Sequence, residues 1–193
     1  MGLITDIARF IQYGDLPTWY YTKRGMNVGK NFNRQSGCKF DPSHCWLISV
    51  GDDVTFANKV QILAHDDSPR FYTGYGKLGL VNVGSRVFVG ANTTILMGVT
   101  IGDDVIIGAG SVVTKDIPSG SVAAGNPCRV ICSIGEYVDK IKNGIETKHC
   151  FDNTYSYDSK DKNLSDERKR EMVEILSKDN GFLFLDKFCE GKK

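Results

Sequence analysis

The sequence predicts an all-β solenoid, a parallel β-helix built from hexapeptide repeats, because two aligned patterns share a period of six. An aliphatic residue returns at every sixth position, as Val83, Val89, Ile95, Ile101, Ile107 and Val113. The fifth positions of these hexads are small or β-branched: Val87, Thr93, Val99, Val105, Ser111 and Ile117. Helices repeat about every 3.6 residues and strands about every 2. A period of six instead indicates a short strand plus a turn, with three such units, about eighteen residues, in each coil.

Glycines that follow the inward aliphatic residues indicate tight corners between these strands. They occur at Gly84, Gly90, Gly102 and Gly108. A corner that brings the backbone of the next coil close leaves little room for a Cβ atom. At such corners we expect Asn92 and Asp103 to adopt the left-handed backbone conformation, which Asn and Asp tolerate.

The repeat extends upstream in a degraded form. Val50, Phe56 and Ile62 keep the spacing of six, and Val28 starts an earlier coil. The stretch "SGCKFDPSHCWLIS" breaks the count and predicts an irregular coil, residues 38–49. A larger break, residues 64–82, contains proline, glycines and aromatic residues but no hexads. We expect it to project as a loop from one face of the solenoid, where functional sites are commonly built.

Helical patterns flank the repeats and divide the chain into three segments: 1–25, an N-terminal helix and linker; 26–132, the β-helix; and 133–193, a helical extension. The first helix is indicated by Ile4, Ile7, Ala8 and Ile11, with Gly14 and Pro17 as its end. The last helix is expected to start at the N-cap Ser165, to carry an apolar stripe and to close at Gly181. The members of that stripe are Met172, Ile175 and Leu176. The polar and aromatic stretch before it, "KHCFDNTYSYDSKDKN", is expected to be an ordered or frayed loop.

Composition narrows the partners and the compartment. The 193 residues include 24 basic and 23 acidic side chains, a net charge of +1, which argues against nucleic acid or an anionic membrane as a partner. No run is long and apolar enough to span a bilayer, so stable membrane insertion is not expected. The opening residues do not resemble a signal peptide, and the six cysteines form no CxxC pair. We therefore expect free thiols in a cytoplasmic protein.

The hexads, followed by "GAGSVVTKDIPSGSVAAGNPCRVI" (108–131), resemble the left-handed β-helix acyltransferases. The most similar members are the galactoside and maltose O-acetyltransferases and the sugar O-acetyltransferases of polysaccharide assembly. The resemblance covers about residues 26–132. It implies left-handed winding, acetyl-CoA as co-substrate, a sugar or glycan acceptor, and no metal. It also implies a homotrimer with each active site between neighbouring subunits, an assembly that would cover the flat apolar faces of a solenoid.

The resemblance further implies one essential histidine, and His65 in "ILAHDDS" stands where that residue is expected, at the root of the projecting loop. A sugar hydroxyl is a weak nucleophile at neutral pH, so a base must take its proton during attack on the thioester. The oxyanion then needs a donor, which by similarity is a backbone N–H near Ala91. From residues alone, His65 also fits a solvated surface histidine. Asp66, Asp67 or a backbone carbonyl would orient its ring.

The same resemblance implies a groove for CoA. Lys115 and Arg129 occupy positions near the adenosine end, and Phe88 stands where the family often has tryptophan. Ala109, Thr114 and the turn at residues 123–125 are small, as the pantetheine arm requires. Ordinary solvent exposure is the alternative for Lys115. The predicted acceptor contacts come from the irregular coil and the loop: Asp41, His44 and Asp67, with loop capping as the alternative for the first two.

Three alternative functions use the same fold. The first is N-acetylation of an amino-sugar nucleotide, which the same base and groove would serve. The second is a metal-dependent carbonic anhydrase, which needs three histidine ligands at a subunit junction, whereas only His44 and His65 lie in the repeats. The third is a non-catalytic scaffold, which gives no reason for a histidine at a loop root. The cysteine pairs 38/45 and 128/132 lack the spacing of a zinc site.

Overall fold

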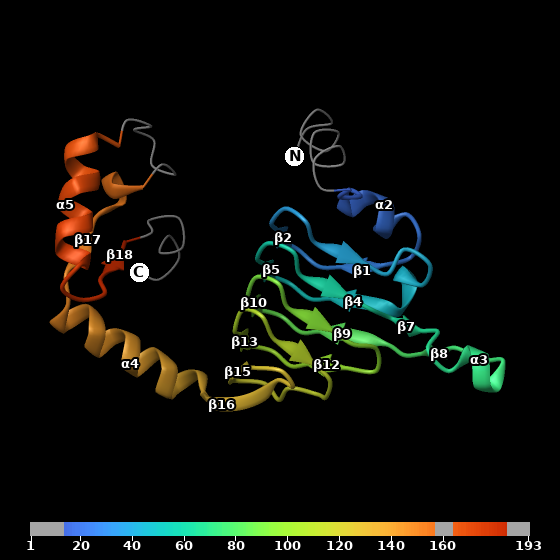
Figure 1. The fold of residues 1–193 in the computed structure, drawn as a ribbon. Helices are drawn as coiled ribbons and strands as arrows, with labels where there is room; N and C mark the ends of the chain where they lie inside the picture. Colours follow the sequence, from blue (N-terminus) through green and yellow to red (C-terminus); the bar gives the residue numbers. More distant parts are fainter. Residues whose placement is uncertain (1–13, 157–163, 185–193) are drawn as a thin grey trace. The chain divides into compact units, whose positions relative to one another are not determined.

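A computed structural model of the chain describes residues 14–156 and 164–184. The chain divides into two compact units, Met1–Tyr137 and Val138–Lys193. The first unit is a parallel β-helix, as predicted, whose stacked coils and projecting insertion are visible in Figure 1. No helix in the described ranges is long and apolar enough to cross a membrane.

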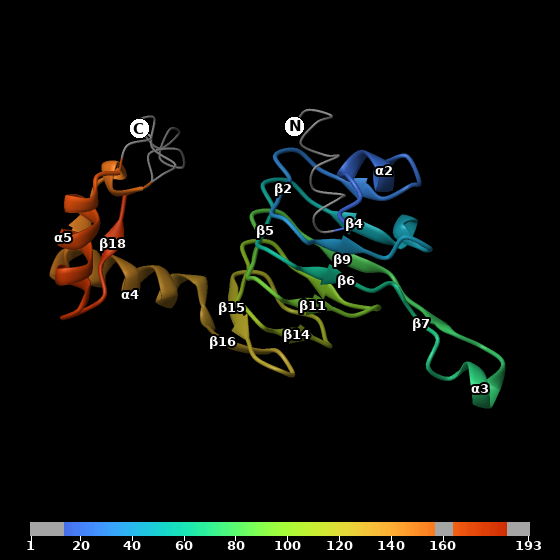
Figure 2. The ribbon, with the colours of Figure 1, turned by 45° about the horizontal axis from the view of Figure 1, so that its top comes forward.

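The β-helix has three sheets, and each coil contributes one short strand to each sheet (Figures 1 and 2). Sheet A contains β1 (Asn27–Val28), β4 (Ile48–Val50), β9 (Val81–Val83) and β12 (Thr100–Ile101). Sheet B contains β2 (Asn33–Arg34), β5 (Thr55–Phe56), β10 (Phe88–Val89), β13 (Ile106–Ile107), β15 (Ser121–Ala124) and β16 (Arg129–Ser133). Sheet C contains β3 (Lys39–Phe40), β6 (Gln61–Ile62), β11 (Thr94–Ile95) and β14 (Val112–Val113). All neighbours within these sheets are parallel except β15 and β16.

The six-residue period sets both the core and the register. Inward residues of successive coils are paired, as in Phe40 with Ile62 and Ile62 with Ile95. Every fifth-position residue from Val87 to Ile117 is buried as well. Each hexad therefore sends two side chains inward, and burial of one valine or isoleucine side chain stabilises the fold by about 1.5–3 kcal/mol. Thr93 and Ser111 satisfy their hydroxyls inside by donating to the carbonyl of Gly108.

The corners between sheets explain the glycines. A Cβ atom on Gly90 would lie 2.4 Å from the backbone nitrogen of Ala109 in the next coil, so a side chain does not fit. Asn92 has a φ of 58°, as predicted. The prediction for Asp103 is wrong by one position, because Asp104 is the left-handed residue with a φ of 55°. Asp103 instead accepts a 2.7 Å hydrogen bond from the N–H of Ser85 and so links two coils.

The first coil and the irregular segment depart from the repeat. Between Phe40 and Val50 the chain inserts a 3-10 helix, η1 (Cys45–Leu47), which accounts for the broken count. Arg34 takes an inward position that is apolar in the later coils, and it is 4% exposed. Its guanidinium donates to the hydroxyl of Thr18 at 3.0 Å and to the carbonyl of Cys38 at 3.1 Å. A buried charge is tolerated here because these groups satisfy it.

The helices differ from the sequence prediction at their ends. The predicted first helix lies almost wholly in residues 1–13, outside the described ranges. Pro17 is the N-cap residue of a further short helix, α2 (Thr18–Thr22). In the second unit, α5 (Asp166–Leu176) has Ser165 as its N-cap, as predicted. It ends before Gly181, which packs against the backbone of His149.

The second unit also contains α4 (Ile134–Thr147), which begins in the first unit, η2 (Asn153–Tyr155), and the parallel pair β17 (Cys150–Phe151) and β18 (Phe182–Leu183). Ser133 and Glu136 form a reciprocal capping box at the start of α4. Phe151 is buried and packs its ring against those of His149 and Tyr155.

Candidate active site

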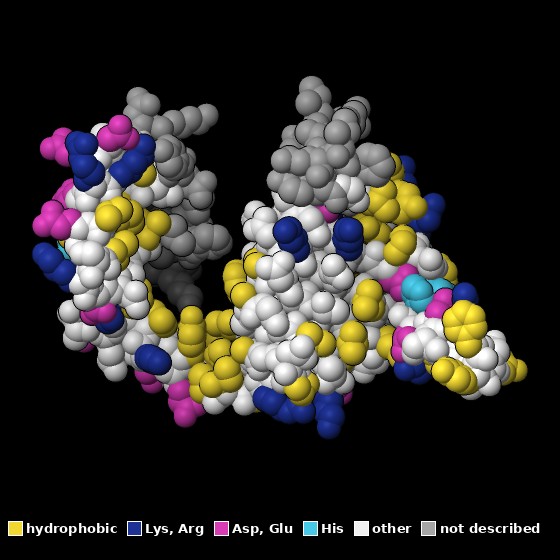
Figure 3. Space-filling model, viewed as in Figure 1, with side chains coloured by type: hydrophobic (Ala, Val, Ile, Leu, Met, Phe, Trp, Pro, Cys, Tyr) yellow, Lys and Arg dark blue, Asp and Glu magenta, His cyan; other side chains and the backbone are white. Residues whose placement is uncertain are grey.

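His65 lies where the chain leaves the solenoid. It opens β7 (His65–Asp66), directly after β6, and β7 pairs in antiparallel fashion with β8 (Lys77–Leu78). Helix α3 (Arg70–Thr73) forms the tip, and β9 resumes the repeat at Val81. We call residues 64–80 the insertion; it leaves from the edge where sheet C meets sheet A, the C–A edge. Histidine and acidic side chains gather at its base in the space-filling view (Figure 3).

Asp41 holds the ring of His65. The Nδ1 atom of His65 forms a short hydrogen bond with Oδ2 of Asp41, and the same oxygen accepts the N–H of Ala64 at 3.1 Å. The other oxygen, Oδ1, accepts the N–H groups of Ser43 at 3.0 Å and His44 at 3.1 Å. Asp41 is 2% exposed. An ionised carboxylate only accepts, so Nδ1 of His65 carries a proton and Nε2 is left with the free lone pair.

These contacts shift the pKa values of both His65 and Asp41. The hydrogen bond that His65 donates to Asp41 raises the pKa of His65 above its ordinary value, and this outweighs the opposing effect of burial. Burial raises the pKa of Asp41, but the hydrogen bonds from His65, His44 and Ser43 outweigh it, so the net pKa lies below the usual value. Asp41 therefore stays ionised near neutral pH and keeps His65 basic.

His44 lies beside this pair. Its ring centroid is 5.0 Å from that of His65 and 5.3 Å from that of Trp46. The side chain is 29% exposed, yet its Nδ1 atom is buried, has no hydrogen-bond partner among the described residues and lies 3.9 Å from Oδ1 of Asp41. The irregular coil thus places His44 next to His65, where both were predicted to contribute to one site.

The three side chains also have the composition of a metal site. One ligand atom from each of Asp41, His44 and His65 lies within 4.8 Å of the others. However, four donors already occupy the oxygens of Asp41, two on each. A metal ion would have to displace the bond to His65. The arrangement therefore fits an acid–base pair better than a resident metal.

The sequence analysis proposed that Asp66 or Asp67 orients the ring of His65, but neither forms the hydrogen bond to Nδ1. Asp66 forms a 2.5 Å ion pair with Lys77 across the β7–β8 pair. Asp67 lies within the insertion, where a Cβ atom on Gly76 would meet its Oδ1 atom at 2.5 Å. Asp41, predicted as an acceptor contact, is the residue that hydrogen-bonds the ring of His65. The repeat contained a signal for this: Phe40 pairs with Ile62, so the residues after them share one edge.

The predicted CoA residues are spread over several parts of the β-helix. Ala91 and Ala109 stack in successive coils at the edge between sheets B and C, the B–C edge, where the N–H of Gly110 donates to the carbonyl of Ala91 at 2.8 Å. Within the described residues, the N–H groups of Ala91 and Ala109 have no acceptor. Two stacked, unused donors at a corner suit the stabilisation of an oxyanion or the binding of amide groups.

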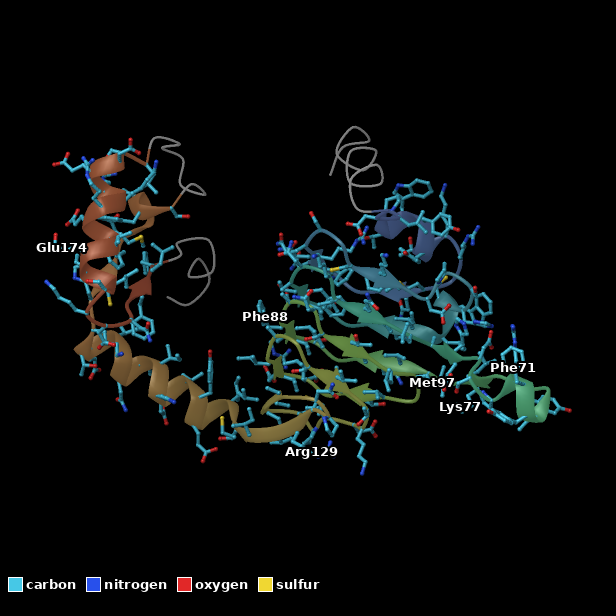
Figure 4. All side chains as sticks on the ribbon, in the orientation of Figure 1. Phe71, Lys77, Phe88, Met97, Arg129 and Glu174 are labelled. Atoms are coloured by element: carbon cyan, nitrogen blue, oxygen red, sulfur yellow. The ribbon has the colours of Figure 1, made fainter. Side chains whose placement is uncertain are left out.

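The remaining predicted groups lie on other parts of the β-helix. Thr114 and Lys115 follow β14 at the C–A edge and are exposed. Phe88 is exposed on the outer face of sheet B, on the opposite side of the β-helix from Met97 and Lys77 (Figure 4). Arg129 begins β16 and is paired with Ala124. A single chain therefore does not bring Ala91 and His65 together, because they lie on opposite edges of sheet C.

Comparison with known proteins agrees with this architecture. The family described as "Hexapeptide repeat of succinyl-transferase" matches residues 80–115. The chain is 35% identical to "Putative acetyltransferase YvoF" of Bacillus subtilis (strain 168), over 75% of this chain and 82% of that protein. A maltose O-acetyltransferase structure from Clostridium difficile 630 is 44% identical, with a TM-score of 0.50, over 55% of this chain and 57% of that chain. A galactoside acetyltransferase structure in complex with coenzyme A is 26% identical, with a TM-score of 0.52, over 70% and 82%.

The similarity to YvoF covers most of both chains, and the structure has the solenoid that the repeat predicts. The chain therefore belongs to the hexapeptide-repeat acetyltransferases.

Proposed function

We propose that the protein transfers an acetyl group from acetyl-CoA to a hydroxyl of a sugar or glycan precursor, with His65 as general base. The observation that carries the proposal is the Asp41–His65 pair at the root of the insertion. The Nε2 atom of His65 is free to accept a proton, and the raised pKa of His65 makes the imidazole a better base. The similarity to a maltose O-acetyltransferase and a galactoside acetyltransferase supports a sugar as the acceptor.

The reaction needs no covalent enzyme intermediate. Nε2 of His65 takes the hydroxyl proton as the acceptor oxygen attacks the thioester carbon. The N–H of Ala91 donates to the oxyanion that forms, and this donor needs no rearrangement because it has no other partner. When the intermediate collapses, the C–S bond breaks and CoA leaves as a thiolate. The imidazolium of His65, stabilised by Asp41, returns its proton to that sulfur.

With His65 as the base and Ala91 as the oxyanion donor, the proposed site needs two copies of the chain. From Ala91 to Leu96 the chain crosses the whole of sheet C, about 16 Å at about 3.3 Å per residue. Reacting groups must lie about 3 Å apart. Because His65 and Ala91 occupy opposite edges of that sheet, one thioester reaches both only if neighbouring subunits contribute one each. A closed ring of three copies satisfies this for every site.

Mixed assemblies test this arrangement. We expect His65→Ala and Ala91→Pro each to be inactive alone, and co-expression of the two to restore part of the activity, because some sites receive both intact groups. Proline removes the N–H of Ala91 and fits a position that precedes the left-handed Asn92. Light scattering should give the mass of a trimer. A monomeric mass at micromolar concentration, or no recovery from mixed assemblies, would contradict the shared site.

The CoA groove is tested by its basic residues. We expect Lys115→Ala and Arg129→Ala each to weaken acetyl-CoA binding about ten- to a hundred-fold, since a charge-assisted contact contributes about 1.5–3 kcal/mol. Turnover at saturating acetyl-CoA should change less. Calorimetric titration measures the affinity, and Lys140→Ala, an exposed lysine of α4, is the control. Unchanged affinity in both variants would place the cofactor elsewhere.

The proposed function itself is tested by an acceptor screen with acetyl-CoA that reads thiol release. It includes neutral sugars, acidic sugars and amino-sugar nucleotides. Preferred transfer to an amino group would support N-acetylation by the same base. Thiol release that does not depend on any acceptor, or on His65, would contradict the proposal.

A further inference from the structure

A polar recess opens on the outer surface of sheet C at the B–C edge, and the reaction described above uses none of its side chains. Its volume is about 250 Å³. Three successive coils each contribute a left-handed corner residue and the first residue of the next strand. The corner residues are Gly37, Lys59 and Asn92, and the strand residues are Lys39, Gln61 and Thr94.

The recess is positively charged and its charge is not neutralised locally. Lys39 and Lys59 are both exposed, and neither forms an ion pair with any described residue. None of the described residues that line the recess is acidic. Asp15 accepts the N–H of Gly37 at 2.7 Å, but its side chain is 1% exposed and is not part of the lining. The two ammonium groups are therefore available to an anion from solution.

The backbone directs one of these lysines. Lys59 has a φ of 61°, a conformation that an L residue rarely adopts. A Cβ atom on Gly37 would lie 2.8 Å from Cγ of Lys59, so the lysine stem crosses the space that a glycine leaves open. Amide and hydroxyl groups of Gln61, Asn92 and Thr94 complete the lining. The recess is smaller than sites for whole small molecules, about 300–1,000 Å³, and suits one charged group with part of a ring.

The recess adjoins the place assigned to the acetyl group. Asn92 lines it, and the preceding residue, Ala91, carries the unused N–H. Below it, at Gly110 and Val112, the face loses its polar side chains. A ligand that follows this face from the apolar coils reaches Ala91 first and the lysines next. An acceptor that reached Ala91 from the opposite direction along this face would meet the lysines first.

We propose that Lys39 and Lys59 bind a carboxylate or phosphate group of the acceptor, so that the preferred acceptor is an acidic sugar or glycan precursor. This rests on the proposed function, which places the acetyl group at Ala91. The lysines act as binding residues: they raise the affinity for the charged acceptor and position its hydroxyl, and they take no part in proton transfer.

Anion binding tests the recess without catalysis. Calorimetric titrations with inorganic phosphate and with galacturonate, in the presence of CoA, compare the wild type with Lys39→Gln, Lys59→Gln and the double variant. We expect each single change to weaken binding of at least one anion about ten- to a hundred-fold. The control is Lys30→Gln, an exposed lysine beside another left-handed corner, which should have no effect. Equal anion binding by the wild type and the double variant would overturn the proposal.

Turnover measurements then distinguish a carboxylate from a phosphate as the recognised group of the acceptor. Galactose, galacturonate and galactose 1-phosphate share one ring and differ in charge. We expect one anionic form to have the highest kcat/KM, and the lysine variants to lower that value while the value for galactose stays unchanged. A lower affinity for acetyl-CoA in these variants would assign the recess to a CoA phosphate, and a changed oligomeric mass would assign it to a subunit contact. Either result would overturn the proposal.

The two proposals fail separately. Acetylation of galactose in preference to both anions, with unchanged anion binding in the variants, overturns the acidic acceptor and leaves the O-acetyltransferase intact. Anion binding that depends on the lysines, without His65-dependent transfer to any sugar, overturns the enzyme function and leaves an anion site.

Discussion

His65→Ala should lower turnover about 10²–10⁴-fold, the usual effect of removing a general base. Without the imidazole, the hydroxyl must lose its proton to water as it attacks, and the partner Asp41 is too deeply buried to replace it. Affinity for acetyl-CoA and oligomeric mass should stay nearly unchanged, because the His65 side chain is 32% exposed and lies outside the stacked core. The measurement is kcat from thiol release on the acceptor found in the screen.

The matched control is His149→Ala, which removes the same ring from the second unit and should change turnover little. If His65→Ala keeps more than about a tenth of the wild-type turnover, the residue is not the base.

Asp41→Asn should lower turnover about 10²-fold, because the ring of His65 loses the partner that fixes its direction and its proton. An amide can also present its NH₂ group to Nδ1, and that arrangement puts the proton on Nε2, where it blocks proton acceptance. The pH dependence gives a second, independent readout. The base works only when unprotonated, so the wild-type rate falls as the pH drops below the raised pKa of His65.

Loss of the carboxylate lowers that pKa, so the acidic limb of the pH–rate profile of Asp41→Asn should move to lower pH even though the maximal rate falls. A purely structural role for Asp41 would reduce the rate without moving the limb. Asp66→Asn is the control, since its carboxylate pairs with Lys77 and raises the pKa of His65 less than the hydrogen bond to Asp41 does. Thermal unfolding must accompany the assay, because Asp41 also satisfies the N–H groups of Ser43, His44 and Ala64.

The solenoid could be predicted from the sequence because the interactions that stabilise it are local and repeat in every coil. Each inward aliphatic residue and each corner glycine follows from stacking one coil on the next, so the period alone fixes the register. The position of His65 at the end of a regular coil could be predicted for the same reason. The helix after Pro17 was not, since five residues carry too little pattern to distinguish a helix from a turn.

The partner of His65 was missed for a different reason. Asp41 is 24 residues upstream and lies in the segment that breaks the count, so its neighbours cannot be read from the period. Once Phe40 is recognised as the inward residue that precedes it, stacking on Ile62 places Asp41 beside the start of the insertion. The lysine recess also crosses three coils, and its members are ordinary surface residues in the linear sequence.

Arg34 and α2 have a consequence for how long the solenoid can grow. A stack of identical coils has no intrinsic end, since the top of the last one is a ready template for the next chain to add to it, as in amyloid. Here the first coil is capped. The guanidinium of Arg34 occupies its interior, and the ring of Tyr21 in α2 packs with its centroid 5.1 Å from that of Phe40. A second molecule that stacked on this coil would have to remove the helix and leave the charge without its partners. The residues that interrupt the pattern at this end therefore oppose the addition of another chain there.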